Sequence, residues 1–106
     1  MPKYLLEVNY TLDGVRGVVA KGGSPREAAA RVAAESVGGQ LDALYFAFGG
    51  TDVFAIADLP DNAAAAALAL AVTSGGGAAV RTIVLLTPEE IDAATRKAVT
   101  YTPPGA

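Results

Sequence analysis

The side chains of this 106-residue sequence that could do acid–base chemistry are carboxylates, lysines and tyrosines, because the chain has no histidine and no cysteine. This composition excludes disulfides, thiolate nucleophiles, histidine-bound haem and catalysis by Ser-His or Cys-His pairs. Glu7 is the strongest candidate for a general base, because it lies in an apolar strand segment where a carboxylate pKa can rise. Arg81 could stabilise a developing oxyanion, or it could simply pair with Glu7 or Asp58.

Two other carboxylates, Asp52 and Asp58, lie at the two ends of the apolar segment VFAIA. A strand of this length separates them by about 20 Å, so they cannot form a catalytic pair or share a metal ion within one chain. The segment also lacks the D-x-[DN]-x-[DN]-G pattern of a calcium loop. We therefore expect both to be charges at the rim of a strand, with Asp52 accepting backbone hydrogen bonds near a turn. No metal site and no cofactor is predicted.

The elements that must position these residues follow from hydrophobic periodicity and from glycine and proline positions. Alternation of period two predicts strands, and apolar residues at helical spacing predict helices. The expected strands cover residues 3–10, 40–48, 51–59 and 78–87, and the expected helices cover residues 24–37, 62–73 and 87–99.

Turn and cap residues set the ends of these elements. Ser24 with Glu27, and Thr87 with Glu90, match the capping box of a helix start. Asp61 is the expected N-cap of the middle helix. The pair Gly49-Gly50 predicts a tight hairpin turn, since glycine adopts a positive φ without strain. Residues 11–21 carry two glycines and are expected to form a helical turn or two at most.

The resulting order, β-α-β-β-α-β plus a C-terminal helix, is that of an α+β, ferredoxin-like fold. We expect a single domain over residues 1–106, with an antiparallel sheet and both main helices on one of its faces. The other face is then left open. By strand alternation it would carry Leu5, Glu7, Asn9, Leu44, Phe46, Phe48, Phe54, Ile56, Arg81, Ile83 and Leu85. A one-residue bulge would reverse this assignment along the rest of a strand.

Such a contiguous apolar patch marks an interface or a pocket. The sequence therefore predicts a homodimer or higher homo-oligomer built on the open sheet face. The net charge of −3 argues against a nucleic-acid partner, because phosphate binding needs a concentrated basic face. No segment is apolar over the length that a bilayer requires, and no signal peptide is recognisable, so no membrane partner and a cytoplasmic location are expected.

In order and spacing, several segments resemble the GYD domain family, small bacterial and archaeal proteins of unassigned function. They are KYLLEVNYT, GGS-x-R, ESVGGQL-x₃-YFAFG, DVFAIADLPD and VRT-x-VLLTPEE, which together span nearly the whole chain. The Gly-Tyr-Asp that gives the family its name corresponds here to Gly50, Thr51 and Asp52. The resemblance implies kinship with dimeric α/β barrels, in which two ferredoxin-like sheets pack face to face. That superfamily includes cofactor-free monooxygenases, isomerases, haem enzymes and ligand sensors.

Two functions fit these observations. The first is a non-catalytic oligomeric module that binds a small apolar ligand or serves as a scaffold. The second is a cofactor-independent monooxygenase or isomerase acting on a small apolar substrate, with Glu7 as its base. An enclosed cavity with Glu7 on its wall would favour the enzyme. The predicted ligand-binding residues are Glu7, Asn9, Tyr45, Phe46, Phe54, Arg81 and Leu85.

Overall fold

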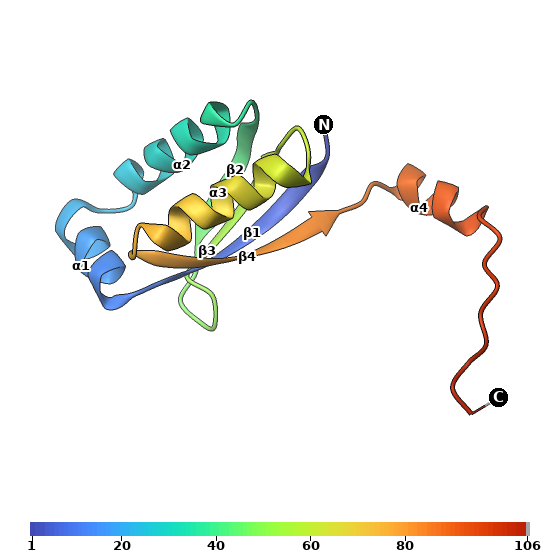
Figure 1. The fold of residues 1–106 in the computed structure, drawn as a ribbon. Helices are drawn as coiled ribbons and strands as arrows, with labels where there is room; N and C mark the ends of the chain where they lie inside the picture. Colours follow the sequence, from blue (N-terminus) through green and yellow to red (C-terminus); the bar gives the residue numbers. More distant parts are fainter. Residues whose placement is uncertain (106) are drawn as a thin grey trace.

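Alternating apolar and polar residues form four strands, and alanine-rich segments form the helices that cover them (Figure 1). The structure is a computed structural model that describes residues 1–105. Its elements are β1 (Lys3–Tyr10), α1 (Leu12–Lys21), α2 (Ser24–Ser36), β2 (Gln40–Phe46), β3 (Val53–Asp58), α3 (Asn62–Ser74), β4 (Ala78–Leu85) and α4 (Pro88–Thr95).

The sheet has the strand order β2-β3-β1-β4, and every neighbouring pair is antiparallel. This is the order of a split β-α-β arrangement, so the predicted α+β fold class is confirmed. Helices α2 and α3 lie over one face of the sheet, and no helix covers the other face in the part of the chain that the structure describes (Figure 1). Within residues 1–105, no helix has the length and apolar character needed to cross a membrane.

The core lies between the sheet and these two helices. Tyr4 and Leu59 are its largest fully buried side chains, and the Tyr4 hydroxyl donates a 2.7 Å hydrogen bond to Oδ1 of Asn62. This bond satisfies the polar end of a ring that would otherwise be costly to bury. Ala57 on β3 and Ala65 on α3 are also buried.

Helix α1 is longer than the helical turn or two expected for this segment. Thr11 caps it by accepting a hydrogen bond from the Gly14 amide, and the Thr11 amide donates to the Gly77 carbonyl at 3.0 Å. A Cβ added to Gly14 would lie 2.0 Å from that carbonyl oxygen. A contact with the distant loop before β4 therefore stabilises a helix that its own glycines weaken.

The predicted caps have different outcomes. Asp61 caps α3 through the Ala64 amide, and Thr87 forms the full capping box with Glu90, so both predictions are confirmed. The Ser24 cap is wrong, because Gly23 is the N-cap of α2 and no side chain bonds to that end. Ser24 is already the first helical residue.

The hairpin between β2 and β3 is also wider than predicted. The Ala47 amide donates to the Asp52 carbonyl at 2.8 Å and closes the loop that contains Gly49 and Gly50. Neither glycine has a positive φ, so the tight turn predicted from the pair is wrong. Phe48 projects from this loop and is fully exposed.

Residues 86–105, here called the arm, leave the body after β4 (Figure 1). Every residue of the arm is exposed, including the large apolar side chains of Leu86, Ile91, Val99 and Tyr101. The radius of gyration is 16.8 Å, whereas a compact domain of this length has about 13 Å. The arm therefore adds apolar surface that the chain does not bury by itself.

Candidate functional site

The open face is the face of the sheet opposite α2 and α3, and four of the predicted site residues lie there in one row. Tyr45 on β2 is beside Phe54 on β3, Phe54 is beside Glu7 on β1, and Glu7 is beside Arg81 on β4. Directly opposite side chains on one sheet face are close enough to interact. Tyr45 is 73% exposed and Phe54 is 37% exposed.

The next row of the open face is wholly apolar. It consists of Ala43, Ile56, Leu5 and Ile83, in the order of the strands. Leu85 lies one row further along, beside Lys3, and so is separated from Glu7 and Arg81 by the apolar row. Except for Phe46, the predicted residues thus share a face, but Leu85 is not part of the cluster around Glu7.

In the first row, Glu7 and Arg81 form an ion pair within one chain. The Nε atom of Arg81 lies 3.6 Å from Oε2 of Glu7, and the Glu7 side chain is 20% exposed. A second guanidinium nitrogen of Arg81 donates to Oγ1 of Thr51 at 3.4 Å. Arg81 therefore links the carboxylate to the loop that precedes β3.

The segment Gly50 to Asp52 is fixed to the end of β1. The Gly50 carbonyl accepts a 2.8 Å hydrogen bond from Nδ2 of Asn9, and the Asp52 carboxylate accepts one of 2.8 Å from the Tyr10 amide. Thr51 is buried, with 8% of its surface exposed. The expectation that Asp52 accepts a backbone hydrogen bond is confirmed, although the donor is in a neighbouring strand. Asn9 also has a structural partner here.

The predicted position of Phe46 is wrong. Phe46 was expected on the open face with Leu44. The structure instead pairs Phe46 with Val53 and Leu44 with Ala55, and these two residues of β3 face the helices. The register of β2 shifts between Leu41 and Ala43, so one extra residue, Asp42, turns the rest of the strand over. Phe46 consequently packs toward the helix layer, where a Cβ added to Gly23 would lie 3.0 Å from its ring.

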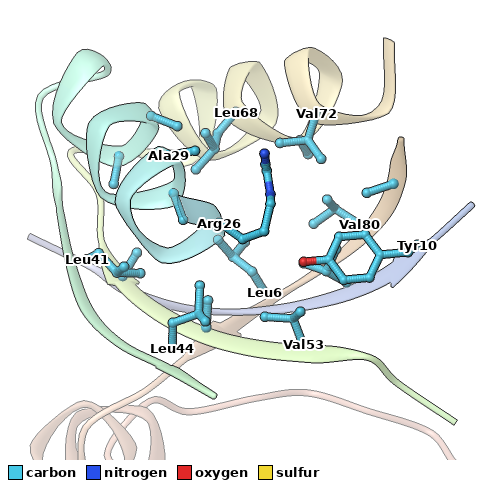
Figure 2. Close-up of a pocket in the computed structure, with 18 residues that line it drawn as sticks. Leu6, Tyr10, Arg26, Ala29, Leu41, Leu44, Val53, Leu68, Val72 and Val80 are labelled. Atoms are coloured by element: carbon cyan, nitrogen blue, oxygen red, sulfur yellow. The ribbon is translucent and has the colours of Figure 1, made fainter. Parts of the chain in front are cut away.

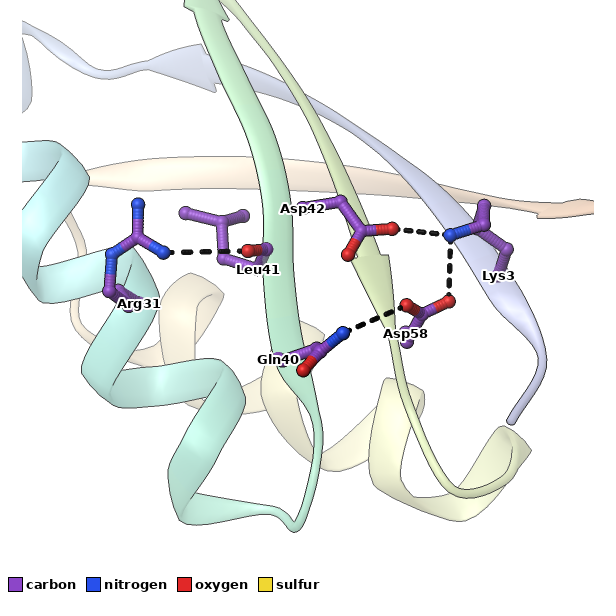
Figure 3. Close-up of polar contacts among 6 residues, drawn as sticks. All are labelled: Lys3, Arg31, Gln40, Leu41, Asp42 and Asp58. Carbon is purple, nitrogen blue, oxygen red and sulfur yellow. Dashed lines mark hydrogen bonds and ion pairs between the residues drawn. The ribbon is translucent and has the colours of Figure 1, made fainter.

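A second polar cluster lies at one end of the open face (Figure 3). The Lys3 ammonium contacts the carboxylates of Asp42 and Asp58, the latter at 2.9 Å, and Gln40 donates to Asp58 at 3.4 Å. The hydrogen bond to Asp42, followed by the bond to Asp58, raises the pKa of Lys3. The Lys3 bond lowers the pKa of Asp58. This cluster therefore links the strands at the end of the sheet through ion pairs.

A pocket lies on the helix side of the sheet, between β1, β3, α2 and α3, and none of the predicted ligand-binding residues lines it (Figure 2). Its volume is about 130 Å³. Its walls are alanine, valine and leucine side chains, and Tyr10 and Arg26 supply the polar groups. Leu44 lines this pocket because of the bulge in β2.

Sequence reasoning did not identify the residues of this pocket, because its volume depends on how far the helices stand from the sheet. One signal was present in the sequence, namely the alanines of α2 that face the sheet, including Ala30 and Ala33. Short side chains on a covering helix leave space when the facing strand residues are also small. Arg26, in the first turn of α2, is the charged residue that lies next to that space.

The comparisons with known proteins identify one similarity. The family model described as the GYD domain matches residues 4–95. No curated protein and no solved structure matches the chain.

Proposed function

The chain belongs to the GYD domain family, and we propose that this member is a non-catalytic homo-oligomeric module that assembles through the open face of its sheet. Its role would be to bind a small apolar ligand or to act as a scaffold. The observation that carries the proposal is the uninterrupted apolar row of the open face, next to a row that contains the exposed rings of Tyr45 and Phe54.

The apolar character of this face favours burial. Leaving a large apolar side chain in water costs about 1.5–3 kcal/mol relative to burying it fully. Phe54 is 37% exposed and Ile83 is 41% exposed in the single chain, and both lie on the open face. A second sheet laid over the first would remove these side chains from water together, which is the usual reason for a contiguous apolar patch.

The charges of the face favour an identical copy as the covering partner. Glu7 is paired with Arg81, and Lys3 is paired with Asp42 and Asp58, all within one chain. Because Glu7 and Arg81 balance one another, a second copy can cover the middle of the face without supplying a counter-ion, and the one excess carboxylate of the Lys3 cluster lies at the end of the sheet. Burying an unpaired charge would cost several kcal/mol, so this internal pairing suits a symmetric interface.

The enzymatic alternative gains no support from the site. It requires Glu7 on the wall of an enclosed cavity, yet Glu7 lines neither the helix-side pocket nor the cleft that adjoins it. The carboxylate is instead engaged with Arg81. The monooxygenase or isomerase hypothesis therefore has no observation in its favour in the single chain.

The proposal predicts that Phe54→Asp produces a monomer. Phe54 lies on β3, an inner strand, so a carboxylate there would be buried in a face-to-face assembly but not in an edge-to-edge one. The expected result in sedimentation velocity is loss of the oligomer, because an unpaired buried carboxylate costs several kcal/mol.

The matched control is Val84→Asp. Val84 is also a strand residue and is 51% exposed, but it lies on the helix side of the edge strand β4. The control should remain oligomeric. Equal behaviour of the two variants, either both oligomeric or both monomeric with intact circular dichroism, would contradict assembly through the open face.

A further inference from the structure

The helix-side pocket combines an apolar interior with a single charged group at its edge. Its lining residues are apolar except for Tyr10 and Arg26. Its volume of about 130 Å³ is close to that of an apolar cavity of about 150 Å³ that stays dry and binds benzene. The interior can therefore hold one aromatic ring or a short aliphatic chain.

The pocket opens into a polar cleft at one end. The cleft lies among α1, the start of α2 and the loop before β4, and has a volume of about 620 Å³. Tyr10, Arg26, Val72 and Ala78 line both spaces, so the pocket and the cleft are continuous. A ligand can thus place an apolar body under the helices and leave a polar group in the cleft.

Arg26 is placed to receive a negative charge at this junction. In Figure 2 its side chain extends from α2 toward α3, and the Tyr10 hydroxyl points into the space below. Among residues 1–105, the ion pairs involve Lys3 and Arg81, and no carboxylate pairs with Arg26. Its guanidinium, which lies beside the Tyr10 hydroxyl, therefore lacks an anionic partner within these residues.

Tyr10 adds a neutral donor next to this charge. Burial raises the pKa of the Tyr10 phenol, the Arg26 guanidinium opposes that shift, and the Asp52 carboxylate adds to it. The net direction is upward, so the hydroxyl keeps its proton at neutral pH and can donate a hydrogen bond.

We propose that this pocket binds a small apolar carboxylate, with its ring or short chain under α2 and α3 and its carboxylate at Arg26. A guanidinium matches a carboxylate in a bidentate geometry, and a single cation balances a single negative charge. Asp13 and Lys21 also line the cleft and offset one another, so a doubly charged phosphate is less well matched. The inference gives a ligand class to the binding role proposed above but does not depend on the assembly.

The test uses benzoate as the probe and benzyl alcohol as its neutral counterpart, each titrated into the full chain by ¹H–¹⁵N NMR. We expect saturable shifts at pocket residues such as Ala33 and Val72, and none at Phe54. Arg26→Gln should weaken benzoate binding about tenfold or more, because it removes a charge-assisted hydrogen bond, and leave benzyl alcohol unchanged. The matched control is Arg16→Gln, an exposed arginine of α1 that lines neither space.

Non-saturable shifts, or benzoate binding that Arg26→Gln leaves intact, would overturn the proposal. A second variant, Ala33→Leu, should fill the pocket and abolish binding of both probes; if it does not fold, Arg26→Gln alone decides. The two proposals fail separately, because the pocket and the open face lie on opposite sides of the sheet. An oligomer that does not bind benzoate contradicts only the pocket, and a monomer that binds it contradicts only the assembly.

Discussion

Gly14 shows how one missing side chain lets two segments meet. A Cβ at this position would lie 2.0 Å from the Gly77 carbonyl oxygen, whereas a Cβ at Gly17, in the same helix, would meet nothing within 4 Å. Gly14→Ala should therefore force α1 away from the loop before β4 and destabilise the protein by about 1–3 kcal/mol. Urea denaturation measures the loss.

Gly17→Ala is the matched control, because it changes the same residue type in the same helix. It should stabilise the chain by about 0.5–1 kcal/mol, since alanine is the better helix former. If both substitutions stabilise the protein, α1 does not rest against Gly77.

Lys3, Asp42 and Asp58 give stability a defined dependence on pH. The pKa of Asp58 is lowered from its ordinary value of 3.8, so its contribution is present above that pH and is lost as pH falls through the lower folded value. The pKa of Lys3 is raised from 10.5, so its contribution is present below that pH and disappears as pH rises through the higher folded value. The Lys3 side chain is 44% exposed, which keeps the effect modest.

Asp58→Asn should therefore reduce the fall in unfolding free energy on acidification below pH 3.8. It should have little effect on the slope between neutral pH and pH 5, where the carboxylate is ionised in both states. Thermal unfolding across an acid pH series would measure this. An unchanged acid slope in the variant would show that the ion pair with Lys3 does not persist in solution.

At the scale of elements, α3 begins at a side chain that caps it, whereas α2 does not. The Asp61 side chain accepts a hydrogen bond from the Ala64 amide at 2.8 Å, whereas Ser24 makes no capping bond. Asp61→Ala should cost about 1 kcal/mol, and Ser24→Ala should cost almost nothing. Chemical denaturation of both variants measures the difference. A loss near 1 kcal/mol for Ser24→Ala would place the start of α2 one residue later.

The elements also show what the sequence can and cannot specify. Period-two alternation correctly placed both faces of β1, β3 and β4, because those strands run without interruption. It misplaced Phe46, because the bulge at Asp42 leaves no mark in the pattern of side chains. Likewise α1 depends on contact with a loop more than sixty residues away, as the Thr11 hydroxyl bond to the Gly76 carbonyl shows. Such long-range contacts override local propensity.

The candidate site, like the elements, was predictable from the sequence only in part. The positions of Phe54, Glu7 and Arg81 follow from strand alternation and topology together, whereas the alternation that put Leu44 and Phe46 on the open face put Tyr45 on the other, and Tyr45 joins the row only because of the bulge at Asp42. The helix-side pocket does not follow from alternation and topology, because it depends on the spacing of α2 and α3 above the sheet. The residue types alone show that alanine side chains face this space. They do not show that a volume of about 130 Å³ remains between them.

At the scale of the whole molecule, two apolar surfaces are left exposed in the single chain. One is the open face, and the other is the arm with Ile91, Val99 and Tyr101. The arm leads away from the body, and the long axis of the chain is 56 Å (Figure 1). One chain thus leaves both surfaces in water. An assembly of identical chains offers each of them a place to be buried.

The most direct test of the central claim is the molar mass of the unmodified protein by sedimentation equilibrium at micromolar concentration. A single chain has a mass of 10.6 kDa. Assembly through the open face predicts a mass of at least two chains that stays constant with rising salt, because the interface is mainly apolar and Glu7 pairs with Arg81 within each chain. A mass of 10.6 kDa at these concentrations, with the folded circular dichroism spectrum retained, would contradict the account.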